Sequence, residues 1–334
     1  MPVIGTFPRA RVSALLAMAL FAMLAIFSPP AHAGCTTQSG TVSLGSVNAF
    51  TVESTPQNAS GSTGFACTGS LLSIISTNQI HATIASVTNS NGTQARLYNA
   101  ASGDYIPYVI CKDAGCSATY AVGSQIDWSS TTFLGILSLF NASDGTLPIY
   151  IRTAPGARVA AGTYSSAISL NWSWHLCALG ALGLCVYDDG TTTSIVNVTM
   201  IVTNDCAITA PTLNFGSAAF VGSFDPVTQS IAIRCTKDAA YSVGIDNGTH
   251  FSATRRLGYN GNYIPYEIYY PASSTTRWGN IGAERRSSAL ATTNAGVYTG
   301  AVDQIYTYKA AILPGGSSLP AGTYTDTLII DVQF

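Results

Sequence analysis

The sequence predicts an all-β protein made of two immunoglobulin-like sandwich domains, the second of which lacks its last strand. Short runs of alternating apolar and polar residues are separated by clusters of Gly, Asn, Asp, Ser and Pro, which is typical of sandwiches. A set of motifs occurs twice, in the same order. The closing motif of the first copy is followed by a further alternating run, which the second copy lacks. No helix is expected after the N-terminal segment.

The N-terminal segment, residues 1–33, is expected to be a secretory signal peptide. Two arginines precede the apolar run from Leu15 to Phe27, and Ala31-His32-Ala33 offers a small-x-small cleavage site. This run is shorter than the ~20 residues that cross a bilayer. Acylation at Cys35, as in a lipoprotein, is the alternative, but His32 stands where an aliphatic residue is preferred.

The composition also favours an exported protein. Of the 334 residues, 47% are hydrophobic and only 9% are charged, with a formal net charge of −2. No basic patch is present that would bind nucleic acid. The eight cysteines all follow the expected signal peptide, and an even number in an exported chain indicates disulfide bonds.

The repeated motifs divide the chain into an N-terminal domain, residues 34–203, and a C-terminal domain, residues 206–334. The matching segments are Cys35 and Cys206, Val42–Gly45 and Leu213–Gly216, Tyr105–Tyr108 and Tyr263–Tyr266, and Gly162–Tyr164 and Gly322–Tyr324. The repeat predicts one long-range bridge per domain, Cys35–Cys67 and Cys206–Cys235. Cys111–Cys116 and Cys177–Cys185 then remain as local loop bridges.

The last segment of the chain predicts a half-buried strand. Leu328, Ile330, Val332 and Phe334 are apolar at every second position. After the equivalent motif in the first copy, a loop and a second alternating run, Ser194–Val202, follow. The N-terminal domain is therefore expected to complete its own sheet, and the C-terminal domain to need a strand from another molecule.

These motifs resemble the spore coat protein U domain, the pilin fold of archaic, Csu-type chaperone–usher pili. Two such domains behind a signal peptide resemble the tip adhesin of that pilus class. The resemblance implies four partners: a periplasmic chaperone, an outer-membrane usher, the next pilin subunit and an abiotic or host surface. The chaperone, and later the next subunit's donor strand, would contact the groove at Leu328, Ile330, Val332 and Phe334. Only Gly34 would precede Cys35 after cleavage, so an extracellular position at the pilus tip is expected.

Three apolar segments distinguish the first domain from the second. Between Cys177 and Cys185, a glycine-spaced apolar stretch is expected to project as a loop, not a strand, with an exposed patch typical of contact sites. Tip adhesins of the resembled class are described as holding apolar surfaces with three hydrophobic finger loops, which the resemblance places at residues 70–76, 132–138 and 178–184. The candidate surface-binding residues are Leu71, Leu72, Ile74, Ile75, Phe133, Leu134, Ile136, Leu137, Ala178, Leu179, Ala181, Leu182 and Leu184. The alternative for residues 133–140 is an ordinary buried strand, and for residues 71–75 and 178–184 a place in the core.

Catalytic and metal-binding patterns are not found. The three histidines beyond the signal peptide lack metal-ligand spacing, and Asp188-Asp189-Gly190 lacks the alternating oxygen ligands of a calcium loop. No enzyme activity, metal or cofactor is therefore expected. Two other functions remain open: a glycan-binding adhesin using Tyr105, Trp128 or Trp172, and a purely structural coat or fibre subunit.

Overall fold

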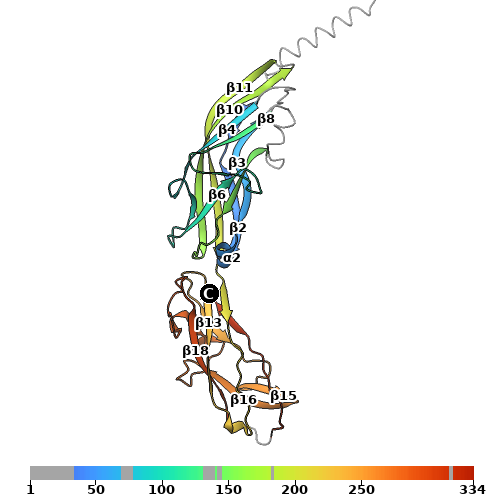
Figure 1. Cartoon of the computed structure of the whole chain (residues 1–334), viewed down its shortest axis with the longest axis vertical. Helices are drawn as coiled ribbons and strands as arrows, with labels where there is room; N and C mark the ends of the chain where they lie inside the picture. Colours follow the sequence, from blue (N-terminus) through green and yellow to red (C-terminus); the bar gives the residue numbers. More distant parts are fainter. Residues whose placement is uncertain (1–33, 69–77, 131–139, 141–144, 182–183, 316–318) are drawn as a thin grey trace, which may run out of the picture.

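The computed structural model describes residues 34–68, 78–130, 140, 145–181, 184–315 and 319–334. The chain forms two β-rich halves stacked end to end along one long axis (Figure 1). We refer to residues 34–203 as the first half and to residues 206–334 as the second half. The expected signal peptide lies outside the described residues.

The first half contains one large, curled sheet. Its strands are β1 (Gly34–Thr37), β2 (Gly40–Asn48), β3 (Asn58–Thr68), β4 (Asn78–Val87), β5 (Ala95–Tyr98), β6 (Tyr105–Cys111), β7 (Thr119–Tyr120), β8 (Gln125–Ser130), β9 (Thr146–Thr153), β10 (Gly162–Ala181) and β11 (Leu184–Thr203). They follow the order β1-β3-β9-β6-β5-β10-β11-β2, while β4 pairs with β10 and β8, and β7 with β6. Because the sheet curls over, its two layers face each other across one core.

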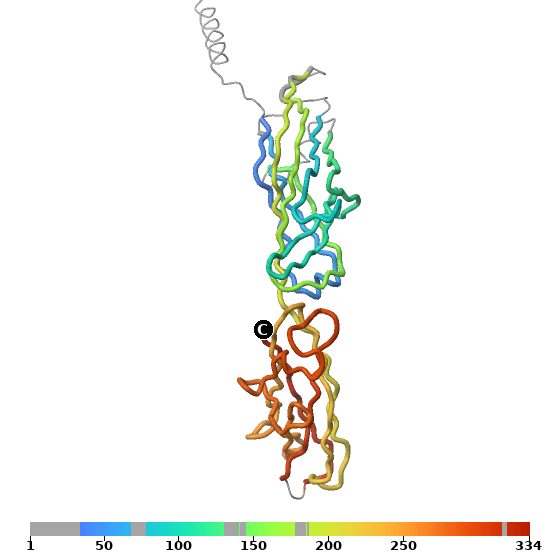
Figure 2. The backbone as a smooth tube through the Cα atoms, turned by 90° about the vertical axis from the view of Figure 1, so that its left-hand side faces the viewer, coloured from blue at the N-terminus to red at the C-terminus, as the bar shows by residue number. Residues whose placement is uncertain are grey.

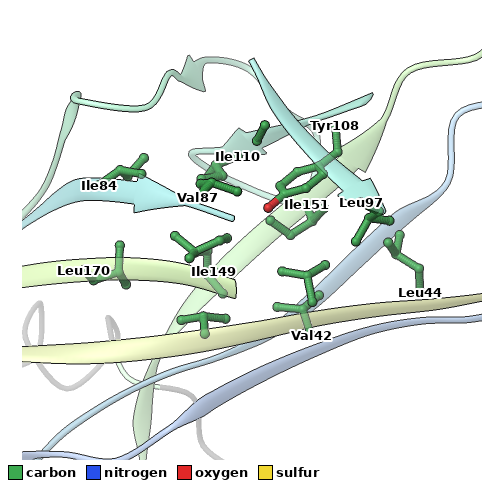
Figure 3. Close-up of a cluster of buried hydrophobic side chains, with 14 of the residues drawn as sticks. Val42, Leu44, Ile84, Val87, Leu97, Tyr108, Ile110, Ile149, Ile151 and Leu170 are labelled. Carbon is green, nitrogen blue, oxygen red and sulfur yellow. The ribbon is translucent and has the colours of Figure 1, made fainter. Parts of the chain in front are cut away.

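Strand alternation builds that core. In β9 every second residue is buried, and the labelled side chains of Ile149 and Ile151 point into the cluster shown in Figure 3. An aromatic stack continues the core towards the outer end, where the Trp172 ring lies 4.5 Å from Phe65 and 5.5 Å from Trp128 between ring centroids. Burying rings of this size contributes strongly to stability.

The second half has two smaller sheets. Its strands are β12 (Cys206–Thr209), β13 (Val227–Cys235), β14 (Ser242–Ile245), β15 (Arg255–Tyr259), β16 (Asn262–Tyr269), β17 (Arg286–Ser287), β18 (Gln304–Ile312) and β19 (Ile330–Gln333), with short 3₁₀ helices η1 (Val221–Ser223), η2 (Gly282–Glu284) and η3 (Ser288–Leu290). The sheet orders are β12-β13-β18-β16-β15 and β17-β14-β19. Trp278 is fully buried at the centre of this core.

The predicted disulfide pattern is confirmed. The bridges are Cys35–Cys67, Cys111–Cys116, Cys177–Cys185 and Cys206–Cys235. The two long-range bridges join paired positions of neighbouring strands, β1 to β3 and β12 to β13. The repeat in the sequence is therefore a repeat in the fold.

Two expectations about local structure were wrong. A short helix, α2 (Ala49–Ser54), follows β2, and the Asn48 side chain caps it by accepting from the Thr51 N–H at 2.8 Å. The backbone expected to form a loop between Cys177 and Cys185 continues as strand, with Gly180 paired to Cys185 and Ala181 to Leu184. A register shift between Cys177 and Leu179 lets the ladder pass the disulfide. In the described part of the chain, no helix is long and apolar enough to cross a membrane.

Candidate functional site

The closing strand of the first half shows what the second half lacks. β11 lies between β10, to which it is antiparallel, and β2, to which it is parallel. Its core-facing side chains are Ser194, Val196, Val198, Met200 and Val202, all buried. One strand thus joins the two layers of the first half and fills the space between them.

The corresponding space in the second half is open. By the internal repeat, β19 corresponds to β10, and residues 211–219 correspond to β2. No strand among the described residues lies between them, and a groove of about 330 Å³ occupies that position. It is lined by Ala210, Pro211, Thr212, Leu213, Phe215, Ile231, Ile245, Leu257, Tyr266, Ile268, Tyr308, Asp326, Thr327, Leu328 and Ile330. The groove lies where the first half has β11, and its walls are mainly apolar.

The predicted groove residues divide into two pairs. Leu328 and Ile330 line the groove. Val332 packs against the core of the second half, and Phe334 is 57% exposed beyond the end of β19. The strand is shorter than the alternating pattern suggested, because it has a ladder partner, β14, on one side only.

An ion pair ties this terminal strand to the body of the second half. The Arg285 guanidinium donates to Asp331 Oδ2 at 2.7 Å and to the Ser242 carbonyl at 2.9 Å. Ser242 belongs to β14, whose Val243 and Ile245 pair with Val332 and Ile330. Arg285 thereby holds β19 against β14, beside the groove.

The groove wall contains one charged residue, Asp326, which the sequence analysis did not single out. Its side chain is 1% exposed. Tyr266 OH donates to Oδ2 at 2.8 Å, while the Thr249 N–H and hydroxyl donate to Oδ1 at 2.9 and 2.7 Å. Burial would raise the pKa of this carboxyl, but the hydrogen bonds outweigh burial and hold the pKa below its usual value. In the first half the equivalent pair is neutral, Tyr108 OH with Ser166 Oγ at 2.8 Å.

This carboxylate predicts an acid-sensitive groove. A carboxyl whose pKa is lower in the folded state contributes stability that is present above its unfolded pKa, near 4, and lost as pH falls through the folded pKa. We expect amides of residues 245–249 and 326–330 to lose protection below about pH 4 in hydrogen exchange measured by mass spectrometry. Asp326→Asn should flatten this dependence, whereas the matched variant of exposed Asp303, Asp303→Asn, should retain it. An unchanged pH profile in Asp326→Asn would contradict the assignment.

The outer end of the first half collects the strand ends that flank the three apolar segments. Asn78, which begins β4, pairs with Ser130, which ends β8. The Asn78 side chain also accepts from the Cys177 N–H at 2.7 Å. Figure 1 shows β4, β8, β10 and β11 reaching the end of the molecule that is farthest from the second half.

The candidate surface-binding residues themselves are only partly described. Residues 71–75 and 133–137, and Leu182, lie outside the described residues. For Ala178, Leu179, Ala181 and Leu184 the structure describes the backbone, which is the outer end of the β10–β11 ribbon. Their role in surface binding therefore stays a prediction.

The three aromatic residues considered for a glycan site do not form one. Trp172 is 2% exposed and belongs to the core, and Trp128 is half-buried against it. Tyr105 is exposed, but it is adjacent to Asp104, which contacts the second half through Lys237. Trp128 and Trp172 thus stack together within the core packing, whereas Tyr105 lies apart from them, beside the second half.

Comparison with known proteins assigns the family. A sequence profile of the Spore Coat Protein U domain matches residues 21–171 and 192–331. The chain belongs to the spore coat protein U domain family. A search of curated protein sequences found no match.

Among solved structures, this spore coat protein U family member is similar to the CsuC–CsuE chaperone–tip adhesion subunit pre-assembly complex from archaic chaperone–usher Csu pili of Acinetobacter baumannii. Identity is 26%, the TM-score is 0.65, and the match covers 90% of this chain and 100% of that chain. Two structures of CfaE, the adhesive subunit of CFA/I fimbria of enterotoxigenic Escherichia coli, match at 8% identity with TM-scores of 0.29 and 0.27. These cover 88% and 89% of this chain and 92% and 99% of theirs. Family and fold are those of chaperone–usher pilus subunits, not of enzymes.

Proposed function

We propose that this pilus subunit is a tip adhesin that joins its fibre through the groove of the second half. The observation that carries the proposal is the contrast between the halves: β11 closes the first, and a groove of about 330 Å³ remains in the second. A subunit built in this way completes one sandwich itself and receives a strand for the other. Its first half then remains free to face outward.

The first half also indicates how the received strand would lie. By analogy with β11, it would run antiparallel to β19 and parallel to residues 211–219, and it would place alternate apolar side chains in the groove. In the first half the residues facing Ile168 and Leu170 across the ladder are Val196 and Ser194. Their counterparts in a donor strand would face Leu328 and Ile330.

An open groove of this kind needs protection before assembly, since unpaired strand edges and apolar walls promote aggregation. The A. baumannii neighbour is described as a chaperone–tip adhesion subunit complex. By that likeness, a periplasmic chaperone occupies the groove of this chain before the next pilin subunit replaces it at the outer-membrane usher. Export to the cell surface, with the signal peptide predicted at residues 1–33, follows from the same route.

The adhesive surface is proposed to lie at the outer end of the first half. The described strand ends that flank residues 70–76, 132–138 and 178–184 meet there. Exposed apolar side chains in such a position would bind abiotic or host surfaces by removing apolar area from water. Attachment through them would support biofilm formation.

Replacing Leu179 and Leu182 together by Ser is expected to abolish attachment to polystyrene while pili remain assembled, because the ribbon tip would lose its apolar side chains. Attachment is measured by retention of cells on plastic, and assembly by electron microscopy. The matched control is the double variant Ile195→Ser and Ile201→Ser, which changes two half-exposed aliphatic residues of β11 away from this tip. Unchanged attachment in the Leu179 and Leu182 variant would exclude the third finger, and inhibition by free sugars would favour a glycan-binding adhesin instead.

A further inference from the structure

The junction between the two halves is formed by a strand that passes from one sandwich to the next. β11 completes the first half, ends at Thr203, and leads through Asn204 and Asp205 into β12, which begins at Cys206. A donor strand in a fibre has the same connectivity: it fills one sandwich and continues into the first strand of its own. The chain therefore contains, within one molecule, the geometry expected between two successive subunits.

Specific side chains hold this junction. The Arg234 guanidinium lies over the Phe50 ring of α2 at 4.7 Å from the centroid, and Lys237 forms an ion pair with Asp104. Arg158 Nη1 donates to the Gly300 carbonyl at 2.9 Å. A crevice of about 10 Å³ lies between the two surfaces and is lined by residues of both halves.

The second half repeats this surface at its other end. Phe50 follows β2 and lies in α2, and Phe220 follows residues 211–219 and immediately precedes η1. The β5–β6 hairpin, with Arg96 over the Tyr105 ring, recurs as β15–β16 with Arg256 over the Tyr263 ring. Figures 1 and 2 place the gold segment that carries η1 at the end of the second half farthest from the first.

Phe50 and Phe220 differ in exposure. This is expected if the two surfaces are equivalent and the second half covers only the one around Phe50. Phe50 is half-buried beneath Arg234, whereas Phe220 is 75% exposed, the highest value among the large hydrophobic side chains described. A phenyl ring left this open loses the favourable burial that its counterpart obtains.

Resting on the proposed role as a fibre subunit, we propose that the surface around Phe220 is the docking site for the next subunit of the fibre. The occupant is the disulfide-bonded end of that subunit's first two strands, placed as residues 206–237 are placed against the first half. The residue immediately before the partner's second cysteine, equivalent to Arg234, lies on the Phe220 ring, and a basic or flat side chain suits that position. The donor strand thus supplies the linkage, and Phe220 fixes the angle between the subunits.

One difference between the surfaces around Phe50 and Phe220 indicates which side chains the next subunit can use for contact. Asp104, which pairs with Lys237, directly precedes the first Tyr-Ile-Pro-Tyr motif, and the residue at the same place in the second half is the uncharged Asn262. The docking surface around Phe220 therefore offers no carboxylate there for a lysine. Stacking on Phe220, not an ion pair, is the main side-chain contact at this joint.

Photo-crosslinking in assembled pili tests the proposal. The photoreactive residue p-benzoylphenylalanine is introduced at Phe220 in the full chain, and for comparison at Leu290, which is 54% exposed. Pili are irradiated, purified, and digested for mass spectrometry. We expect an adduct from position 220 with a different pilus subunit, mapping beside its second cysteine, and no such adduct from position 290.

The outcomes separate this proposal from the proposed function. If the chain is incorporated into pili but position 220 yields no adduct, or an adduct elsewhere on the partner, the docking site is wrong and the donor-strand role stands. If the chain is absent from pili altogether, both fail. As a second readout, Phe220→Ser should widen the distribution of angles between the tip subunit and the next subunit in electron micrographs, and Leu290→Ser should leave this distribution unchanged. An unchanged angle distribution in Phe220→Ser would overturn the proposal.

Discussion

Appending a copy of residues 190–203 to Phe334 through a two-residue Asn-Gly turn is expected to convert the second half into an independently stable domain. The turn favours a tight hairpin, so the added strand would return antiparallel to β19, as β11 does along β10. The four apolar core-facing residues of β11 are Val196, Val198, Met200 and Val202. At ~1.5–3 kcal/mol each they would contribute up to ~6–12 kcal/mol, an upper limit because the unfolded chain already buries some apolar area.

This gain is comparable to the whole stability of an ordinary domain. Two measurements follow its effect. Hydrogen exchange should show new protection in residues 211–219 and 326–333, and calorimetry should show an added cooperative transition. The extended chain should also fail to enter pili, because its groove is already filled.

The control for this variant is the same extension with one residue deleted after the turn. A one-residue shift exchanges the faces of a strand, so Ile195, Asn197, Thr199 and Ile201 would face the groove, with two polar side chains at its centre in place of Val198 and its neighbours. The shifted copy should stabilise the second half by clearly less than the unshifted copy. If the unmodified second half already resists exchange and melts cooperatively, or if both extensions act alike, the groove is not an acceptor for a strand.

Much of this architecture could be predicted because the sequence carries it twice. Cys206 and Cys235 take the same places in the second copy as Cys35 and Cys67 in the first, and both pairs form bridges between neighbouring strands. The alternation of Leu328, Ile330 and Val332 indicated a face turned to the core, and all three are partly buried against it. Repeated motifs and alternation of apolar residues can be recognised in the sequence without knowledge of tertiary contacts, and both predicted the structure correctly here.

Several of the features that were not predicted depend on contacts between residues that are distant in the sequence. β19 is shorter than the alternating pattern because none of the described strands pairs with its second edge. α2 has only six residues, too few to show helical periodicity, although Asn48 provides a cap. Asp326 could have been noticed, since it is in phase with Leu328 and Ile330 and so faces inward. Its partners Tyr266 and Thr249 are far away in sequence, and only the structure brings them to it.

The second half also buries an ion cluster that has no equivalent among the described residues of the first half. Arg255 is fully buried and forms an ion pair with Glu267, and Arg277 Nε donates to the second Glu267 oxygen at 2.9 Å. Arg255 donates further to the carbonyls of Ile245 and Trp278, at 2.6 and 2.8 Å. Arg255 pairs with Tyr266 across the β15–β16 ladder, as Ala95 pairs with Tyr108 across the β5–β6 ladder. In the first half, Ala95 therefore takes the place of Arg255, and Val109 takes the place of Glu267.

The position of this cluster relates it to the groove. Ile245 lines the groove and ends β14, the strand that holds β19, so the Arg255 hydrogen bond fixes the backbone of the groove wall. A wall that faces an empty groove lacks the packing that β11 supplies in the first half. Hydrogen bonds and ion pairs have directional geometry, and we expect them to hold the wall in register before a strand arrives.

Glu267→Ala is expected to destabilise the second half by ~3–5 kcal/mol, because it leaves the buried guanidinium of Arg255 without its counter-charge. The measurement is denaturant unfolding of the chain carrying the appended strand described above, in which this half unfolds as a unit. Glu284→Ala provides the matched control: its carboxylate also pairs with Arg277 but is 41% exposed, so a loss within ~1 kcal/mol is expected.

The double variant Arg255→Met with Glu267→Met tests whether the stability lost in Glu267→Ala arises from an unpaired charge or from lost packing. If the penalty arises from an unpaired buried charge, removing both partners should cost less than Glu267→Ala alone, since apolar side chains of similar length can fill the same space. Without the appended strand, the double variant should nevertheless bind a donor strand more slowly than the chain with Arg255 and Glu267 intact. Its groove wall would lose the hydrogen bonds from Arg255 to the carbonyls of Ile245 and Trp278. Equal costs for Glu267→Ala and Glu284→Ala would show that the cluster is solvated and does not support the groove.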